Sequence, residues 1–172
     1  MPEPIQKAVR RFWALLDSET VRLFVWPFFI GLLCWGIYGT FFSAPIQFVY
    51  PVMGEAWYNI WIWMHIPGPA AVLAGLMMRR GGTPIAQMST PMLFRDYMGL
   101  WLQLGGYVTM FFALLYYEIS AIQATHWGAS AFSVFALAPY VLGCLFLALQ
   151  TGRKLWRGET LHRATRKHGW HK

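Results

Sequence analysis

Residues 22–42 of the chain read RLFVWPFFIGLLCWGIYGTFF and carry no charged side chain after Arg22. A helix of about 20 residues crosses the hydrocarbon core of a bilayer, because each residue adds about 1.5 Å towards a thickness of roughly 30 Å. The stretch is also longer than the apolar part of a signal peptide, which holds roughly 7–15 residues. It therefore predicts a membrane-spanning helix that is retained in the protein.

Three further stretches, residues 57–78, 97–117 and 131–151, have a similar length and no internal charge. A charge at the bilayer centre costs about 2.5–3.5 kcal/mol on insertion scales, so Glu118 is expected at the outer edge of the third stretch, in reach of water. Only 12% of the residues are charged, about half the share of a soluble domain. The sequence thus predicts an all-α polytopic membrane protein with four transmembrane helices in a single membrane domain, residues 1–172.

Every lysine and arginine lies in one of three segments, residues 7–22, 79–95 and 153–172. The two other connections, residues 43–56 and 118–130, contain none. Basic residues beside membrane helices stay on the cytoplasmic side, so both chain ends and the middle connection are expected there. An even number of crossings follows, and we predict a multi-pass protein of the cytoplasmic (inner) membrane.

Basic segments flank the predicted helices at both ends of the chain. Residues 1–21 place apolar side chains at helical spacing, with the cations mainly on the other face, which predicts an amphipathic helix in the membrane interface. Residues 152–172 form a basic cytoplasmic tail whose expected partner is the lipid bilayer, since nothing in it is typical of specific nucleic-acid recognition. The residues predicted to bind lipid headgroups are Lys7, Arg10, Arg11, Arg79, Arg80, Arg153, Lys154 and Arg157.

Tryptophan and tyrosine residues cluster near the predicted membrane surfaces. Trp57, Tyr58, Trp61 and Trp63 are expected near the outer surface, and Trp101 is expected near the inner one. Their rings combine an apolar body with a polar edge and prefer the level of the headgroups. We interpret these residues mainly as an anchoring belt.

The middle of the second predicted helix reads His65-Ile66-Pro67-Gly68-Pro69. Each proline lacks an amide donor, so helical hydrogen bonds are lost and a strong kink is expected. A histidine deep in a membrane helix is a candidate for a functional site. Two interpretations stay open: a polar gate formed by His65, Pro67, Gly68 and Pro69, or a neutral histidine bonded to a neighbouring helix beside a packing kink.

Small and polar residues predict contacts between the helices, because glycine and alanine let two backbones approach closely. Gln103, Thr109 and Gln150 are expected to form interhelical hydrogen bonds worth about 1 kcal/mol each. Cys34 and Cys144 are interpreted as buried apolar residues and not as a disulfide pair. The predicted packing residues are Gly36, Gly39, Ala71, Gly75, Gln103, Gly105 and Gly106.

Motifs for catalysis and cofactor binding are missing from the sequence. The chain has no C-x-x-C, G-x-S-x-G, H-E-x-x-H or P-loop motif. Two haems across a helical bundle need paired histidines on facing helices, and the predicted helices contain only His65. No carboxylate of the kind used by small multidrug transporters is expected deep in the membrane. We therefore predict a protein that is not an enzyme and has no catalytic, cofactor-binding or metal-binding residues.

The chain resembles the holin-like membrane proteins in lysis cassettes of phages of actinobacteria. The resemblance lies in the layout of the whole chain, the lack of catalytic groups and the tail GRKLWRGETLHRATRKHGWHK at residues 152–172. It carries no motif from which a residue's role could be transferred. It implies a protein that self-associates in the cytoplasmic membrane until lesions form, which release or activate a cell-wall-degrading enzyme.

Three functions are compatible with the sequence. The first is a holin-like homo-oligomer that forms a pore and permeabilises the cytoplasmic membrane in phage lysis. The second is a non-enzymatic accessory, scaffold or exclusion subunit that docks another membrane protein through the basic tail and the segment SAPIQFVYPVMGEAWYN, residues 43–59. The third is a small-solute channel or transporter centred on His65.

Overall fold

The computed structural model describes residues 21–47, 49–79, 90–125 and 131–168, so the predicted helix of residues 1–21 lies almost wholly outside it. No strand occurs in these ranges, and the predicted all-helical class is confirmed there. The helices are α2 (Val21–Phe41), α3 (Tyr50–Met53), α4 (Glu55–Met64), α5 (Pro67–Met78), α6 (Thr90–Thr125) and α7 (Ala131–His168).

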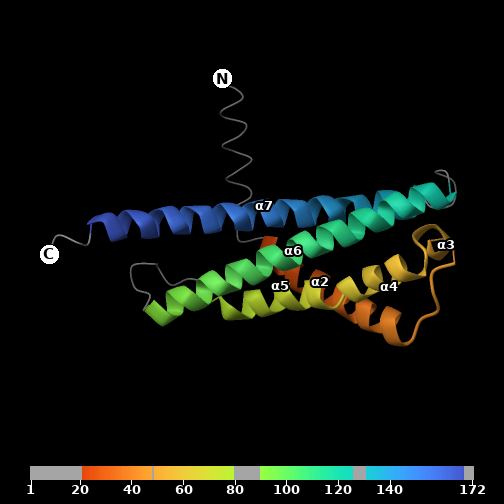
Figure 1. Cartoon of the computed structure of the whole chain (residues 1–172), viewed down its shortest axis with the longest axis horizontal. Helices are drawn as coiled ribbons and strands as arrows, with labels where there is room; N and C mark the ends of the chain where they lie inside the picture. Colours follow the sequence, from red (N-terminus) through yellow and green to blue (C-terminus); the bar gives the residue numbers. More distant parts are fainter. Residues whose placement is uncertain (1–20, 48, 80–89, 126–130, 169–172) are drawn as a thin grey trace, which may run out of the picture.

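α6 is the central helix of the bundle (Figure 1). α5 and α7 both pack along it, and α2 packs against α4 and α5. Figure 1 shows the C-terminal end of α2, the short α3 and the adjoining ends of α6 and α7 at one end of the molecule. The end of α5, the start of α6 and the C-terminal end of α7 lie towards the opposite end.

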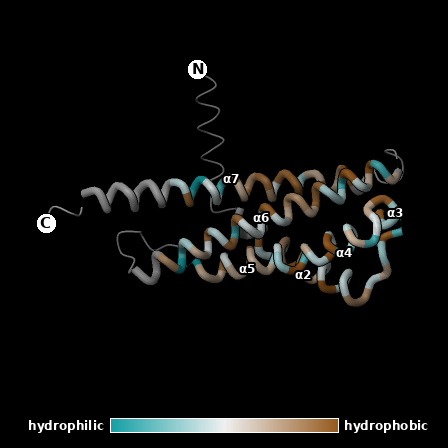
Figure 2. Tube along the Cα trace, viewed as in Figure 1, coloured by the Kyte–Doolittle hydropathy of each residue, from teal (hydrophilic) through white to brown (hydrophobic). Residues whose placement is uncertain are grey.

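Three helical segments are long and apolar enough to cross a membrane: Glu55–Met78, Phe94–Ala124 and Val134–Trp156. α2 adds a shorter apolar stretch, Val25–Phe41, within its described side chains. Figure 2 shows hydrophobic residues along much of the coloured length of the helices. The large apolar side chains exposed on this surface include Tyr38, Phe42, Phe94, Phe112, Phe135 and Leu142. An apolar surface of this extent suggests a membrane protein.

α6 and α7 extend beyond the crossings that the sequence predicts. Glu118 was expected at the edge of its helix in reach of water, but it lies inside α6 and is only 9% exposed. The prediction ended the helix at the first charge, whereas the residues that follow, ISAIQAT, contain no proline or glycine to stop it. α7 likewise continues past residue 151 to His168, so most of the predicted tail is helical.

The contact between α5 and α6 is built on glycine. Gly68 and Gly75 on α5 are seven residues apart, as are Gly99 and Gly106 on α6, and this spacing returns to one helix face after about two turns. A Cβ atom at Gly99 would come within 2.9 Å of the Gly75 carbonyl oxygen, and one at Gly106 within 2.6 Å of the Gly68 carbonyl oxygen. The two backbones can approach this closely only because no side chain separates them.

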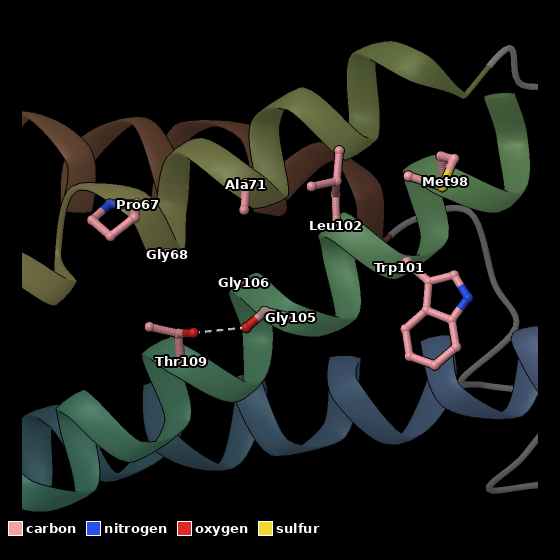
Figure 3. Close-up of a pocket in the computed structure, with 9 residues that line it drawn as sticks. All are labelled: Pro67, Gly68, Ala71, Met98, Trp101, Leu102, Gly105, Gly106 and Thr109. Carbon is pink, nitrogen blue, oxygen red and sulfur yellow. Dashed lines mark hydrogen bonds between the residues drawn. The ribbon is translucent and has the colours of Figure 1, made fainter.

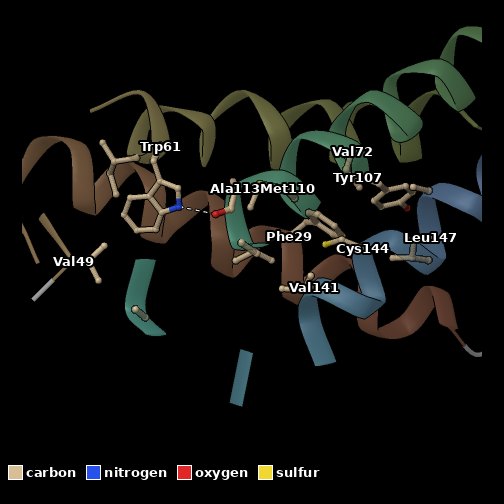
Figure 4. Packing of buried hydrophobic residues seen from close by; sticks show 14 of the residues in the cluster. Phe29, Val49, Trp61, Val72, Tyr107, Met110, Ala113, Val141, Cys144 and Leu147 are labelled. Atoms are coloured by element: carbon tan, nitrogen blue, oxygen red, sulfur yellow. Dashed lines mark hydrogen bonds between the residues drawn. The ribbon is translucent and has the colours of Figure 1, made fainter. Parts of the chain in front are cut away.

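A second contact joins α2 to α6 and α7. Phe29 of α2 is fully buried, and its ring centroid lies 5.4 Å from that of Tyr107 on α6. Phe28 stacks on Tyr140 of α7 with centroids 5.0 Å apart. Cys144 of α7 is buried in the same cluster (Figure 4). Aromatic pairs of this kind contribute about 0.5–1.5 kcal/mol each beyond the area that they bury, so they fix the position of α2.

The two cysteines have different environments. Cys34 is exposed on α2, which corrects the prediction that both cysteines are buried. Phe29 and Gly36 mark the packed face of this helix. Cys34 is five residues beyond Phe29, a rotation that turns it about 140° away from the packed face.

We expect Gly106→Ala to lower the thermal stability of the protein in detergent. The methyl group would press on the Gly68 carbonyl and on Val72, and such overpacking costs about 1–3 kcal/mol. Alanine gains only about 0.5–1 kcal/mol over glycine in a helix. Unfolding followed by circular dichroism measures the difference. Gly143→Ala on α7 is the control, since its Cβ would meet nothing within 4 Å; equal midpoints for the two variants would contradict the glycine contact.

Candidate functional site

His65 lies in the turn between α4 and α5, and its side chain is fully buried. Its Nδ1 atom is 2.9 Å from the carbonyl oxygen of Trp61. A carbonyl oxygen only accepts hydrogen bonds, so Nδ1 carries the proton in this contact. Nε2 has no hydrogen-bond partner among the described residues. The imidazole therefore adds a donor to the last turn of α4.

Two indole rings pack against the imidazole. Trp35 of α2 and Trp61 of α4 meet it edge to face, with centroid distances of 4.7 and 4.9 Å. Trp61 also donates its Nε1 hydrogen to the Ala113 carbonyl oxygen of α6 at 2.8 Å (Figure 4). Its ring stacks on Tyr117 of the same helix. Trp61 is thus buried and joins α4 to α6, which corrects its predicted place in an anchoring belt at the membrane surface.

Local hydrogen bonds close the break between α4 and α5. Pro67 is the first residue of α5, where a missing amide donor costs little. In a continuous helix its amide would bond to the carbonyl of Trp63, and the amide of Ile66 bonds to this oxygen instead, at 3.1 Å. The amide of His65 donates to Ile62 at the same distance. The helix breaks at the position that the prolines indicate, and these carbonyls keep their partners.

The side chain of His65 is enclosed by packing within the chain. α2 passes close to the turn, because a Cβ atom at Gly36 would come within 2.5 Å of the His65 carbonyl oxygen. Gly39, about one turn further along α2, lies against Ile62. Among the described residues His65 is therefore enclosed where α2 meets α4.

An open apolar groove of about 350 Å³ lies between α5 and α6 (Figure 3). Gly68 and Ala71 of α5 and Gly105 of α6 line it, and Trp101 stands towards the start of α6. A Cβ atom at Gly105 would meet nothing within 4 Å. Gly105 was predicted to contact another helix, but no other helix in the described part of the chain lies within 4 Å of its Cβ position. Thr109 donates to the Gly105 carbonyl of its own helix at 2.9 Å, which corrects the predicted interhelical bond.

Polar side chains cluster where α5 ends and α6 begins. Arg95 donates through Nε to the Met78 carbonyl oxygen at 3.0 Å, which satisfies a terminal carbonyl of α5. Arg79 donates to Oε1 of Gln103 at 3.5 Å, and its Nε lies 3.9 Å from a carboxylate oxygen of Asp96. Gln103 is buried against Gly75, so this cluster fixes the hairpin of α5 and α6.

Few of the predicted lipid-binding cations lie among the described side chains. Arg79 belongs to the polar cluster, and Arg153 and Lys154 lie partly buried on α7. The side chain of Arg157 on α7 falls outside the described residues. The remaining predicted residues also fall outside them: Lys7, Arg10, Arg11 and Arg80.

Two structural residues were missed from the sequence. Gly99 of α6 packs against Gly75 of α5. Its spacing of seven residues from Gly106 repeats the spacing of Gly68 and Gly75. Comparing the two spacings would have found it. Arg95 caps the C-terminal end of α5 by donating a hydrogen bond to the Met78 carbonyl. No pattern in the sequence indicates that this arginine binds a helix end and not a lipid headgroup.

The described residues define a class of protein: they are helical, three of their helical segments are long and apolar enough to cross a membrane, and the fully buried His65 is packed between two tryptophans. Within the searched part of the chain, no group of three or more His, Cys, Asp or Glu side chains could hold a metal ion. No protein-family model, curated protein or solved structure matches the chain. Any functional assignment therefore rests on its own residues.

Trp61→Phe is expected to destabilise the fold, and Trp63→Phe is not. The first change removes the bond to Ala113, worth about 0.5–1.5 kcal/mol, and leaves unfilled space in the core, for a total of about 1–3 kcal/mol. Trp63 is 52% exposed, so the same replacement there removes little packing. Unfolding by SDS, followed by circular dichroism, compares the two variants. Equal losses would show that the buried indole bond adds nothing.

Proposed function

We propose that the protein crosses the cytoplasmic membrane four times, with both ends on the cytoplasmic side. In that membrane it self-associates and permeabilises the bilayer, in the manner of a holin in phage lysis. The observation that carries this proposal is the open, glycine-containing groove between α5 and α6, because it is a helix-packing surface that no described helix of the chain occupies.

The arrangement of the helices supports four crossings. α2 has 21 residues, a length of about 31 Å at 1.5 Å per residue, which suffices for a crossing beside the three long apolar segments. Arg79 follows α5 and Arg95 lies near the start of α6, and both helix ends lie at the end of the bundle opposite α3. With this basic end in the cytoplasm, α3 lies on the outer side.

The groove between α5 and α6 is suited to a helix of a second copy. In lipid, apolar side chains gain nothing by leaving the solvent, and helices associate where small residues allow close packing. Gly75 and Gly106 use this principle inside the chain, and Ala71 and Gly105 present small residues on the outside. No charged residue lines the groove, so a second helix placed there would bury no charge.

Permeabilisation is proposed to occur between copies and not through one chain. His65 is fully buried, with α2 and Trp61 packed against it. A solute moving past it would have to displace the rings of Trp35 and Trp61. This enclosure favours an assembly over a small-solute channel centred on His65.

The topology predicts opposite labelling of two introduced cysteines. Ser43→Cys should react with a membrane-impermeant maleimide in intact cells, because residue 43 follows α2 on the proposed outer side. Thr83→Cys, in the basic connection, should react only after the membrane is broken. Both cysteine variants also carry Cys34→Ser and Cys144→Ser, so that the maleimide can react only with the introduced cysteine. Labelling of position 83 in intact cells would rule out the proposed topology.

Gly105→Leu is expected to weaken self-association and to slow the loss of membrane potential after induced expression. The leucine adds bulk to the lining of the groove, and its Cβ atom meets nothing within 4 Å in the described part of the chain. Overpacking of the contact between copies by about 1–3 kcal/mol lowers the association constant roughly 5- to 150-fold. Cross-linking in membranes measures assembly, and a potential-sensitive dye measures permeabilisation.

Gly31→Leu on α2 is the matched control, because Gly31 is also exposed and has nothing within 4 Å of its Cβ position. Equal assembly of the two variants would show that the groove is not the contact. An unchanged membrane potential on expression of the unaltered chain would contradict the permeabilisation proposal. Recovery of a single copy with one other membrane protein at fixed stoichiometry would instead support an accessory subunit.

A further inference from the structure

α7 continues as a helix beyond the part of it that is apolar enough to cross a membrane. The apolar segment ends at Trp156, and the helix runs on through residues 157–168. This stretch contains no proline that would break the helix. It adds about 18 Å of helix, and Figure 1 shows the C-terminal end of α7 projecting past the start of α6. In the proposed topology residues 157–168, the α7 extension, therefore project from the cytoplasmic surface of the membrane.

Positive charge is concentrated on the α7 extension. Its sequence, RGETLHRATRKH, contains Glu159 as its acidic residue beside four arginine and lysine residues. Arg163, Arg166 and Lys167 have the spacing i, i+3 and i+4, which places them on one face of the helix, the basic face. Trp156 lies seven residues before Arg163, on the same side of α7, and is 73% exposed. The basic face thus continues a side of α7 that is open where its side chains are described.

Cations outnumber acidic residues on the cytoplasmic side of the protein. The chain has 14 lysine and arginine residues and 7 acidic ones, and the proposed topology places every cation on the cytoplasmic side. Glu55 starts α4 and Glu118 lies near the outer end of α6, so both belong to the outer half. Whatever pairs form within the chain, the cytoplasmic side keeps a surplus of positive charge. A second copy brings the same surplus, so a specific anionic partner must be another molecule.

Distance argues against lipid headgroups as the partner of the far end of α7. With Trp156 at the edge of the hydrocarbon core, the headgroup layer covers roughly the next 5–8 Å. Arg166 and Lys167 lie about 15 Å or more beyond Trp156 along the helix. The remaining separation of roughly 8–11 Å is at least the Debye length of about 8 Å at physiological ionic strength. Attraction between these two cations and the lipids is therefore largely screened.

Nucleic acid also fits the basic face poorly. A protein that binds a duplex through its phosphates makes about 6–10 contacts to them. Arg163, Arg166 and Lys167 supply three cations within about 6 Å of helix. The anionic lipids of the inner leaflet also repel a polyanion that approaches the membrane. A compact group of three cations instead matches a short run of aspartate or glutamate in a protein.

We propose that the α7 extension docks an acidic segment of a cytoplasmic partner protein. Arg163, Arg166 and Lys167 pair with the carboxylates of that segment. Exposed ion pairs contribute little singly and are weakened by salt, so the contact is reversible and sensitive to ionic strength. The site rests on the topology given under the proposed function, but it requires neither self-association nor permeabilisation.

Fluorescence anisotropy of a labelled oligoglutamate peptide, mixed with the full chain in phosphatidylcholine nanodiscs, tests this site. We expect the peptide to bind and to be released as salt is raised. Changing Arg163, Arg166 and Lys167 together to glutamine should lower the affinity about 3- to 150-fold, since one exposed ion pair accounts for about 1.4- to 5-fold. The control changes the same number of cations in the N-terminal segment, Lys7, Arg10 and Arg11, to glutamine and should retain most of the binding.

A nitroxide label at Ala164→Cys, in a chain that also carries Cys34→Ser and Cys144→Ser, measures where the α7 extension lies. It should be relaxed mainly by a water-soluble nickel complex. The same label at Leu149→Cys, a position 58% exposed within the apolar segment, should be relaxed mainly by oxygen dissolved in the lipid. A label at position 164 that behaves like the one at position 149 would place the extension in the membrane and overturn the proposal.

The remaining outcomes distinguish the partners. Equal loss of peptide binding in the two triple variants would show a diffuse electrostatic effect and overturn the site. Loss of binding in nanodiscs of equal parts phosphatidylcholine and phosphatidylglycerol would assign the basic face to lipid headgroups. Tighter binding of duplex DNA than of the peptide would assign it to nucleic acid. Both faces of a nanodisc are open to the peptide, so binding is measured whether or not the proposed topology and the pore hold.

Discussion

The close approach of α5 and α6 is the contact on which the rest of the structure depends. Helices in lipid gain little by hiding apolar side chains, so their association relies on dispersion contacts between closely packed backbones. Gly75 and Gly106 make that approach possible by removing the side chains that would separate the two helices. Arg95 closes the end of the hairpin on the Met78 carbonyl. With α6 fixed, α7 packs along it, and Phe29 positions α2 against Tyr107.

The break before Pro67 would be costly in an apolar surrounding if it left backbone groups unpaired. The chain avoids this cost locally, because the amide of Ile66 bonds to the carbonyl that Pro67 cannot reach. Trp61 then joins the end of α4 to the Ala113 carbonyl of α6, and the His65 imidazole donates to the Trp61 carbonyl. The His65 imidazole thus adds a donor to the last turn of the broken helix, while its Nε2 has no hydrogen-bond partner among the described residues.

The sequence predicts the positions of the helices well, because length, charge exclusion and proline act locally along the chain. It does not predict which face of a helix meets which neighbour. Trp61 was assigned to a surface belt from its aromatic neighbours, yet a bond to α6 buries it. Glu118 was placed at a helix end because charge was taken to stop the helix, although backbone bonding continues past it. Gly105 and Gly106 were both predicted to pack against another helix. Successive residues of a helix are rotated by about 100°, so the two glycines lie on different faces of α6.

That rotation has a physical consequence for assembly. Gly106 points at α5 and is used within the chain, whereas Gly105 points into an open groove without charge. The groove on the α7 side of α6 is also apolar but ends at Arg153. A helix of a second copy placed in the first groove would bury no charged side chain of its lining. The groove beside α5 is therefore the one that we propose as the contact between copies.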